Sequence, residues 1–552
     1  MKVLLAIFSV IPAICQLAGS DRNDSSLITK SSDGAYFPKA EYRPHPLPTF
    51  AELRDRLPAP IYDEQAEWIA MYWKSWELAF RNFHEPAPES HFVSQFIDAA
   101  FNQNIFLWDT CFMTMFCNMA HPLVPGIASL DNFYAKQHAD GEICREINRA
   151  TGVDYGPWMN REGRPLFSRN GWLPQQPDAP VIYRGRATPE PPPFLTLDAL
   201  DNPLPAWAEL ESLRVTGDHG RIAMVFVPLK QYFQALQKYL RQGNGLYVTD
   251  WASMDNSPRN SFIANGGTAV DTSCQMVLFA RNLAAMAELL GKAAQARAFT
   301  AEADELSRTI NELMWDPAQH FYFDLTLDGQ RAPVKTVAAF WALLGRVASR
   351  EQAACLVAEL RNPKTFARPN RTPTLAANEP GYDPTGGYWR GAVWTPTTMM
   401  VIRGLELYGY SEEARAIALS NLQLMRRVYQ KTGTIWENYA PEAPTPGQPA
   451  KNDFVGWSGL GPIEWLLEFA IGLKPDSPKN DLLWELRSRQ RLGCERYRFN
   501  GHLVSLLARP GQGASGGFTI TIISDGAFTL QLQKGTQRQT VEVHAGEQTI
   551  TF

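Results

Sequence analysis

Hydrophobic side chains recur every three to four residues along most of the chain, and this spacing predicts α-helices. The helical segments are of two kinds. Segments such as 293–314 and 411–430 are amphipathic, because charged residues occupy one face. Segments such as 268–290, 390–409 and 457–471 are apolar nearly all round, so each must be buried on every side. Alternating outer and inner helices predict an (α/α)6 toroid, with helices near 62–83, 105–120, 122–138, 204–216, 218–241, 268–290, 293–314, 333–345, 350–361, 390–409, 411–430 and 457–471.

The two ends of the chain follow different patterns. Residues 1–20 combine a basic start, a short apolar core and small residues, as a secretory signal peptide does, so we expect a secreted or periplasmic protein. Residues 21–60 are polar and proline-rich and predict an extended leader. The helical pattern of the expected catalytic domain fills 61–480, with a long insertion on one rim at about 140–203. A period of two over 493–552 predicts a small β module.

Two carboxylates lie in loops that are rich in aromatic and polar residues. Asp255 belongs to the run Met-Asp-Asn-Ser-Pro, and Glu437 belongs to the run Trp-Glu-Asn-Tyr. In an (α/α)6 toroid, every loop from an outer to an inner helix emerges on the same rim, and both loops are of this kind. The order of helices around the ring then places Glu437 across the central cavity from Asp255. Two such carboxylates are the minimum equipment for hydrolysing a glycosidic bond.

Each carboxylate also has an ordinary explanation. Loop aspartates commonly cap a helix or form an Asx-turn, although Asp255 lies well before the predicted start of the next helix. Glu437 could instead pair with Arg426 or Arg427. The shared rim and the aromatic neighbours favour a functional interpretation of both acids.

Other polar residues of the same rim have two interpretations each. Asp109 begins an inner helix, where aspartate is an ordinary first-turn residue, but it would also accept hydrogen bonds from sugar hydroxyls. Arg390 would either close the start of the next helix or orient a carboxylate and sugar hydroxyls. Asp271 and Gln275, one helical turn apart, would face the cavity together or be buried and paired.

The composition limits the classes of partner. A net charge of −5 offers no attraction to nucleic acid or to an anionic membrane, and no later stretch reaches the ~20 apolar residues of a membrane span. The chain has no Cys-x-x-Cys pair, which argues against zinc-ribbon or thioredoxin chemistry. Hydrolysis by two carboxylates needs no cofactor, and the presence of a structural calcium ion stays open. We therefore expect a small carbohydrate as the partner of this chain.

Taken together, the motifs resemble glycoside hydrolase family 63, in the superfamily shared with family 37 trehalases. They are Trp108-Asp109, Met254-Asp255-Asn-Ser-Pro-Arg259, Tyr388-Trp-Arg-Gly-Ala-Val-Trp394, Glu437-Asn-Tyr439 and Gly456-Trp-Ser-Gly-Leu-Gly461, within about residues 60–470. Each motif alone is weak, but the combination is specific. The chain is more similar to compact bacterial members that hydrolyse mannosylglycerate or glucosylglycerate than to trehalases, which typically carry a different signature where Tyr388-Trp-Arg-Gly stands.

The resemblance implies an (α/α)6 barrel and hydrolysis of an α-glycosidic bond with inversion. By match of motif, Asp255 would be the general acid and Glu437 the general base. The subsite for the non-reducing sugar would be lined by Trp108, Asp109, Gln137, Tyr388, Trp389 and Trp394. Further candidates for substrate binding are Asn256, Arg259, Gln275, Arg390, Tyr439 and Trp457.

Three alternatives to an exo-acting α-glycosidase of this type stay open. The first is a trehalase-type hydrolase. The second is a polysaccharide lyase on the same toroid, which would use a Tyr or His with a neutralising Arg, although the rim has few histidines. The third is a non-catalytic sugar-binding protein, which would keep the tryptophans but would not need both acids.

Overall fold

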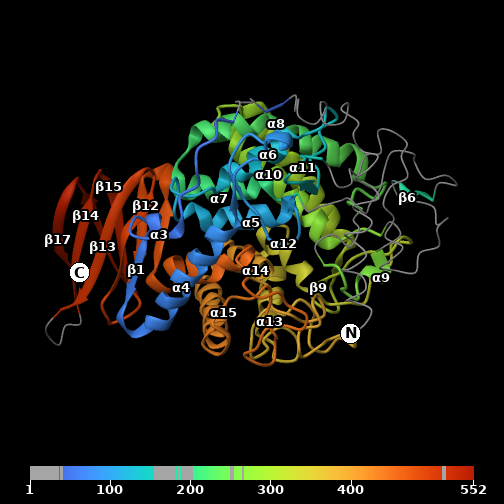
Figure 1. Cartoon of the computed structure of the whole chain (residues 1–552). Helices are drawn as coiled ribbons and strands as arrows, with labels where there is room; N and C mark the ends of the chain where they lie inside the picture. Colours follow the sequence, from blue (N-terminus) through green and yellow to red (C-terminus); the bar gives the residue numbers. More distant parts are fainter. Residues whose placement is uncertain are drawn as a thin grey trace.

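A helical domain and a β region make up the described part of the chain. The computed structural model describes residues 36–37, 42–153, 203–248, 254–263, 267–511 and 517–552, with the backbone of 182–183 and 186–187. Figure 1 shows the C-terminal strands gathered on one side of the helices. The predicted signal peptide, residues 21–35 and 38–41 of the leader and most of the insertion lie outside the described residues. In the described part of the chain, no helix combines the length and apolarity of a membrane span.

Most of the predicted helices form with nearly the expected bounds. They are α4 (Ala66–Ala79), α5 (Leu107–Asn118), α7 (Pro205–Thr216), α8 (His219–Leu240), α10 (Val270–Leu289), α11 (Ala293–Leu313), α13 (Arg350–Arg361), α14 (Thr395–Leu407) and α15 (Ser411–Thr432). Shorter helices and turns are α3 (Phe50–Leu53), α9 (Asn260–Ile263), η1 (Asp63–Gln65), η2 (Phe80–Asn82), η3 (Pro88–Ser90) and η9 (Ser477–Lys479). The hydrophobic period therefore predicts the longer elements well.

Three predicted helices differ from the expectation. The segment 122–138 contains only η4 (Ile127–Leu130) and α6 (Asp131–Ala135), because Pro122, Pro125 and Gly126 keep its first part out of a helix. The segment 333–345 is reduced to η6 (Val337–Phe340) and α12 (Trp341–Leu344). The last segment is a 3₁₀ turn, η7 (Trp457–Leu460), followed by a π-helix, η8 (Gly461–Ile471).

Burial separates the helices into the two predicted kinds. Every residue of α10 from Val270 to Ala280 is buried, whereas α11 buries only Ala296, Ala303, Leu306, Ser307 and Ile310. Helix α5 contacts α7, α7 contacts α10, α10 contacts α12, α12 contacts α14, α14 contacts η7, and η7 contacts α5. Helices α4, α8, α11 and α15 each contact a helix of this cycle or its continuation η8. The apolar helices thus contact one another in sequence, with the amphipathic helices packed against them.

The β region contains two sheets. One has the order β1 (Ala59–Tyr62), β12 (Leu492–Phe499), β13 (His502–Pro510), β14 (Phe518–Ser524) and β17 (Gly546–Thr551); the other has β10 (Leu473–Asp476), β11 (Asp481–Glu485), β15 (Phe528–Lys534) and β16 (Gln537–Val543). Alternate residues of β14 and β15 are buried, as the period of two predicts.

The sheets extend beyond the predicted β module in both directions along the sequence. Strands begin at Leu473, before the predicted boundary at 493, and β1 comes from the end of the predicted leader. Strand β1 is antiparallel to β12, and Ala59 pairs with Glu495. A four-residue strand carries too little alternation to be recognised in the sequence alone. The β region is therefore joined to the start of the helical domain as well as to its end.

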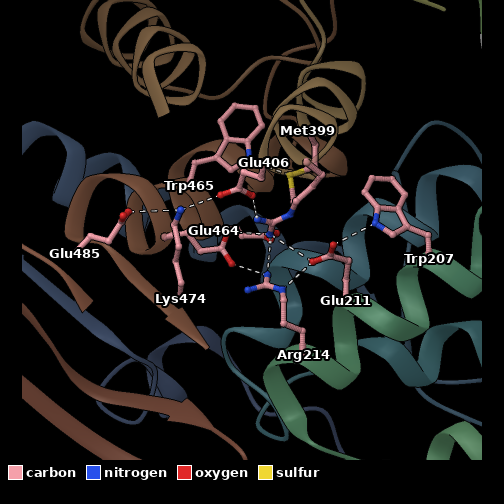
Figure 2. Close-up of polar contacts among 11 residues, drawn as sticks. Trp207, Glu211, Arg214, Met399, Glu406, Glu464, Trp465, Lys474 and Glu485 are labelled. Carbon is pink, nitrogen blue, oxygen red and sulfur yellow. Dashed lines mark hydrogen bonds and ion pairs between the residues drawn. The ribbon is translucent and has the colours of Figure 1, made fainter. Parts of the chain in front are cut away.

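A buried network of charged residues connects the helices to the β region (Figure 2). Arg403 of α14 lies 2.9 Å from Glu464 and 2.8 Å from Glu468, both on η8. Arg214 of α7 lies 2.5 Å from the same Glu468. Burial and the neighbouring Glu468 carboxylate raise the pKa of Glu464, against the lowering effect of Arg403 and Arg214.

The network continues into the sheet through a lysine. Lys474 of β10 lies 2.8 Å from Glu406 of α14 and 3.5 Å from Glu485 of β11 (Figure 2). Glu406 in turn lies 3.1 Å from Arg403. Charged groups that are removed from water must be paired, so the helices α7 and α14, the π-helix η8 and the sheet are constrained together at this place.

Candidate active site

Four tryptophans meet where three helical elements begin. Trp108 lies in the first turn of α5, Trp394 immediately precedes α14, and Trp457 begins η7. The rings of Trp389 and Trp394 are stacked, with centroids 4.2 Å apart and an interplanar angle of 7°. The ring of Trp457 lies 5.5 Å from that of Trp394 and 5.6 Å from that of Trp108. All four side chains are buried, and they form one aromatic cluster from distant parts of the sequence.

Glu437 lies beside this cluster and is held at both carboxylate oxygens. Its Oε1 accepts a hydrogen bond of 3.1 Å from the Tyr388 hydroxyl, and its Oε2 accepts one of 2.9 Å from the backbone N–H of Lys451. The indole N–H of Trp457 donates to the Glu437 carbonyl at 3.0 Å. The side chain is 5 % exposed. The alternative pairing with Arg426 or Arg427 is not observed, because Arg426 contacts Glu67 instead.

The electrostatic environment of Glu437 favours its neutral form. Burial raises the pKa of this carboxyl to about 7, although the hydrogen bonds from Lys451 and Tyr388 oppose the shift. The negative charge of Asp255 raises the Glu437 pKa further. The two acids therefore interact electrostatically, although they are far apart in the sequence. A carboxyl with a pKa near neutrality can exchange a proton during a reaction at physiological pH.

The Tyr388 hydroxyl contacts the Glu437 carboxylate and interacts electrostatically with two more carboxylates. Burial raises the pKa of this phenol well above its usual value, and the charges of Glu437, Asp255 and Asp109 raise it further. Tyr388 therefore stays protonated and acts as a hydrogen-bond donor to Glu437. Its backbone has a φ of +66°, which is uncommon for a residue with a side chain. The indole N–H of Trp394 donates to the Tyr388 carbonyl at 3.1 Å.

Asp255 lies in a loop that is anchored on both sides. The side-chain amide of Asn260 donates to the carbonyls of Met254 at 2.8 Å and Asp255 at 3.2 Å. Met254 is buried and Asp255 is half-buried, so the loop is seated on the core while its acid keeps partial access to solvent. Asn260 begins the one-turn helix α9, well ahead of α10. Asp255 therefore does not cap α10, which was one of the two ordinary explanations for this residue.

Arg259 is buried and paired with two aspartates. Its guanidinium donates to Asp271 at 2.7 and 2.8 Å and lies 2.9 Å from Asp324, and its side chain is 2 % exposed. Asp271 is buried and paired with Arg259, which is one of the two arrangements that the sequence left open. Burial raises the pKa of Asp324 to about 6, against the lowering effect of Arg259. This triad fixes the C-terminal side of the Asp255 loop to the start of α10.

Three more of the predicted binding residues make hydrogen bonds within the protein. Gln137 is fully buried, and its amide nitrogen donates to the carbonyls of Gly141 and Pro228, both at 2.9 Å. Arg390 is exposed and donates to the Gly381 carbonyl at 3.0 Å, so it closes its own loop rather than reaching the carboxylates. Tyr439 is buried and its hydroxyl accepts the backbone N–H of Trp436 at 3.2 Å. The side-chain oxygen of Gln137 has no hydrogen-bond partner among the described residues, so Gln137 stays a candidate for binding a ligand.

The remaining predicted residues differ in whether their polar groups already have partners within the protein. Asn256 is exposed, yet both atoms of its amide bond to the backbone of 387–389. Gln275 is fully buried one turn after Asp271, and neither amide atom has a hydrogen-bond partner among the described residues. Because buried amides normally have partners, Gln275 stays a candidate for binding a ligand. The negative charge of Asp109 acts on the Tyr388 hydroxyl, and Asp109 likewise stays a candidate for binding a ligand.

Lys451 is a site residue that the sequence did not predict. Its backbone N–H donates a hydrogen bond to the Glu437 carboxylate. Burial lowers the pKa of its ammonium group, and the negative charges of Glu437 and Asp98 oppose this shift. No motif surrounds Lys451, and only the pairing of the two strands of this loop brings it to Glu437. Within the ranges that the structure describes, no three His, Cys, Asp or Glu side chains are grouped to hold a metal ion.

The family of the chain follows from comparison with known sequences. The sequence model named "Mannosylglycerate hydrolase MGH1-like glycoside hydrolase domain" matches residues 159–458, which is more than half of the 552 residues. The chain belongs to this family. The prediction of membership in glycoside hydrolase family 63 is thereby confirmed, and the matched range includes both Asp255 and Glu437.

Individual members of the MGH1-like glycoside hydrolases match over shorter segments. The mannosylglycerate hydrolase of Rubrobacter radiotolerans is 29% identical over 192 residues, which are 34% of this chain and 41% of that protein. The mannosylglycerate hydrolase of Thermus thermophilus is 33% identical over 155 residues, which are 28% of this chain and 35% of that protein. The matched segments thus span less than half of either curated hydrolase.

A solved structure of the same family shares the fold. The GH63 mannosylglycerate hydrolase from another strain of Thermus thermophilus, in complex with glucose, superimposes with a TM-score of 0.52 at 18% identity. The superposition covers 71% of this chain and 99% of that chain. This MGH1-like chain therefore contains the whole fold of the smaller protein together with additional residues.

Proposed function

We propose that this protein is an inverting, exo-acting α-glycosidase that hydrolyses a small α-linked hexoside. The observation that carries the proposal is the buried Glu437 carboxylate, hydrogen-bonded to Tyr388 beside the tryptophan cluster, with the charge of Asp255 acting on both groups. A pair of carboxyl groups in an aromatic, partly dry site is what glycoside hydrolysis requires, since aromatic faces pack against sugar rings. Membership in a glycoside hydrolase family supports the same reaction.

In the proposed reaction each acid has a separate task. Asp255 donates its proton to the glycosidic oxygen while the bond from that oxygen to the anomeric carbon breaks. Glu437 takes a proton from a water molecule, whose oxygen forms the new bond on the opposite face of the sugar. A water molecule fits between the acids if their carboxyl groups stand roughly 6.5–9.5 Å apart, the separation typical of inversion. The product is the free sugar with the opposite anomeric configuration, and a proton must then return from Glu437 to Asp255 through solvent.

We also propose that the helices form an (α/α)6 toroid whose central cavity holds the sugar. The sequential contacts of the apolar helices, from α5 through α14 to η7 and back to α5, support this arrangement. The start of α5, the start of η7 and the residue before α14 contribute to the site at one end of these helices. The buried charge network around Arg403 lies further along α14 and η8, where it stabilises the other end.

The substrate is best sought among small α-glycosides. Relatives named as mannosylglycerate hydrolases suggest mannosylglycerate as the first compound to test, with glucosylglycerate and trehalose beside it. We expect release of the hexose from one of the two glycerate glycosides and little from trehalose. An unsaturated, ultraviolet-absorbing product would instead identify a lyase. Binding of these sugars without any hydrolysis would identify a sugar-binding protein and refute the proposal.

The pH dependence of kcat/KM should reflect the ionisation of the Glu437 carboxyl. A general base acts in its ionised form, and the pKa of Glu437 is raised to about 7, so kcat/KM should fall as the pH drops through about 7. The rate falls toward low pH because protonated Glu437 cannot accept a proton from the attacking water. Initial rates at substrate concentrations far below KM, measured from about pH 5 to 9, test this limb. A profile that stays flat down to about pH 5 would exclude Glu437 as a base with this pKa.

A further inference from the structure

Asn256 links the two halves of the proposed site. Its side-chain N–H donates to the carbonyl of Gly387 at 2.9 Å, and its side-chain oxygen accepts the backbone N–H of Trp389 at 2.9 Å. These contacts join segments that are 131 and 133 residues apart in the sequence. Both polar atoms of the amide are used, and they bind the residues on either side of Tyr388. The neighbour of Asp255 therefore holds the backbone that presents Tyr388.

The backbone around Tyr388 needs such support. Positive φ angles occur at Gly386 (+110°), Gly387 (+52°), Tyr388 (+66°) and Gly391 (+144°). A residue with a side chain persists in this region only where its surroundings hold it. A Cβ atom at Gly387 would lie 2.7 Å from the Cβ of Asp383, so the segment is also tightly packed on its inner side. The amide of Asn256 contacts this segment from the side of the acid loop.

Through Tyr388, the contact extends to the second carboxylate. The Tyr388 hydroxyl donates to Glu437 at 3.1 Å, and Glu437 is further held by Lys451. A continuous path thus runs from Asp255 through Asn256 and Tyr388 to Glu437. A change in the position of the Asp255 loop relative to the Tyr388 segment would alter the separation between the two acids, and small errors of this kind are costly in catalysis.

We propose that Asn256 is a positioning residue that sets the separation of the acid and the base by clamping the Asp255 loop to the Tyr388 segment. The inference rests on the proposed function of Asp255 and Glu437. It replaces the expectation that Asn256 binds the substrate, because its amide hydrogen bonds are directed to backbone atoms. The clamp acts through Tyr388, so the variants Asn256→Ala and Tyr388→Phe should disturb Glu437 in the same way.

The first test compares the activity of single and double variants. Asn256→Ala should lower kcat/KM by a factor of the order of 10² through misplacement of the acids. The double variant with Tyr388→Phe should be no slower than the slower single variant, because both changes break one path. A full multiplication of the two effects would overturn the proposal, since it would show that Asn256 acts independently of Tyr388.

The second test does not depend on any activity. Infrared difference spectra recorded over a pH titration report the carboxyl of Glu437, with Glu437→Gln as the reference that assigns its signal. The titratable groups that act on Glu437 are Asp255, Tyr388 and Lys451. The hydrogen bond from Tyr388 lowers the pKa of Glu437, so its loss should raise that pKa. Asn256→Ala should therefore shift the titration upward, and Tyr388→Phe should shift it in the same direction. A titration unchanged in Asn256→Ala but shifted in Tyr388→Phe would overturn the clamp.

Asn311→Ala is a matched control for an amide that joins two segments elsewhere. Its side chain donates to the Val347 carbonyl at 2.8 Å and accepts the Tyr322 hydroxyl. Loss of these bonds should lower the stability without shifting the Glu437 titration. The two tests also separate the proposals: if the parent protein hydrolyses no sugar, the proposed function fails, while the infrared titration still decides whether Asn256 positions Tyr388.

Discussion

Replacing Glu437 by Gln is expected to lower kcat by a factor of ~10²–10⁴, because the amide cannot accept the proton of the attacking water. The same factor should appear in kcat/KM, since the lost interaction exists only in the transition state. The fold should persist, because Gln has the same shape and removes a buried charge rather than adding one. Circular dichroism and the thermal midpoint check the fold, and initial rates on the best substrate check the activity.

Replacing Asp255 by Asn should lower the rate by a similar factor but respond differently to the leaving group. A glycoside whose aglycone departs as a phenolate needs no proton from the protein. Asp255→Asn should therefore recover much of its activity on such a substrate, whereas Glu437→Gln should not, since its water still lacks a base. This contrast assigns the acid and the base independently of any structure.

Glu442→Gln serves as the matched control, because this carboxylate lies close after Glu437 in the sequence. Glu442 is already paired, with Arg368 at 2.6 and 2.9 Å and with the Tyr382 hydroxyl at 2.6 Å. We expect its replacement to leave kcat close to that of the parent. Near-normal turnover by either Asp255→Asn or Glu437→Gln would remove that residue from the mechanism, and a large loss in Glu442→Gln would move the base to Glu442.

The largest expected effect on stability comes from Arg259→Met. The change leaves the Asp271 and Asp324 carboxylates buried together without the guanidinium that pairs with both. Removal of one partner from a buried ion pair typically costs about 3–5 kcal/mol of the free energy of unfolding. Chemical denaturation monitored by tryptophan fluorescence measures this cost. Activity should fall as well, because Arg259 anchors the loop that carries Asp255.

Arg390→Met is the control for this prediction. Arg390 lies in the neighbouring segment of the site but is exposed, and its contact within the described chain is to the Gly381 carbonyl. Its replacement should change the free energy of unfolding by no more than ~0.5 kcal/mol. If Arg259→Met were as stable as Arg390→Met, the buried triad would not support the loop, and Arg259 would again be a candidate for binding substrate.

The sequence predicted most of the helices because burial imposes a period on them, and it singled out Asp255 and Glu437 by their aromatic and polar neighbours. It could not distinguish the roles of Arg259 and Arg390, since both stand in polar loops close to aromatic residues. The distinction depends on Asp324, which comes from a different part of the chain and is brought to Arg259 only by folding. The same holds for Lys451, whose backbone reaches Glu437 through the pairing of two loop strands.

The pairing of strand β1 and the hydrogen bonds of Asn256 are further features that the sequence alone does not predict. The partner of β1 lies near the other end of the chain, and the partners of Asn256 are backbone atoms, which leave no trace in the pattern of side chains. The predicted role of Asn256 followed from its place beside Asp255. Its hydrogen bonds to Gly387 and Trp389, on which the proposed positioning role rests, are visible only in the folded structure.

The most direct measurement for the central claim is the configuration of the first sugar released, followed by proton NMR before mutarotation. Asp255 and Glu437 acting on opposite sides of an α-glycoside, with a water molecule between the base and the sugar, release the β-anomer first. Initial appearance of the α-anomer would require a covalent intermediate and carboxyl groups close together, and it would contradict the proposed arrangement of the two acids.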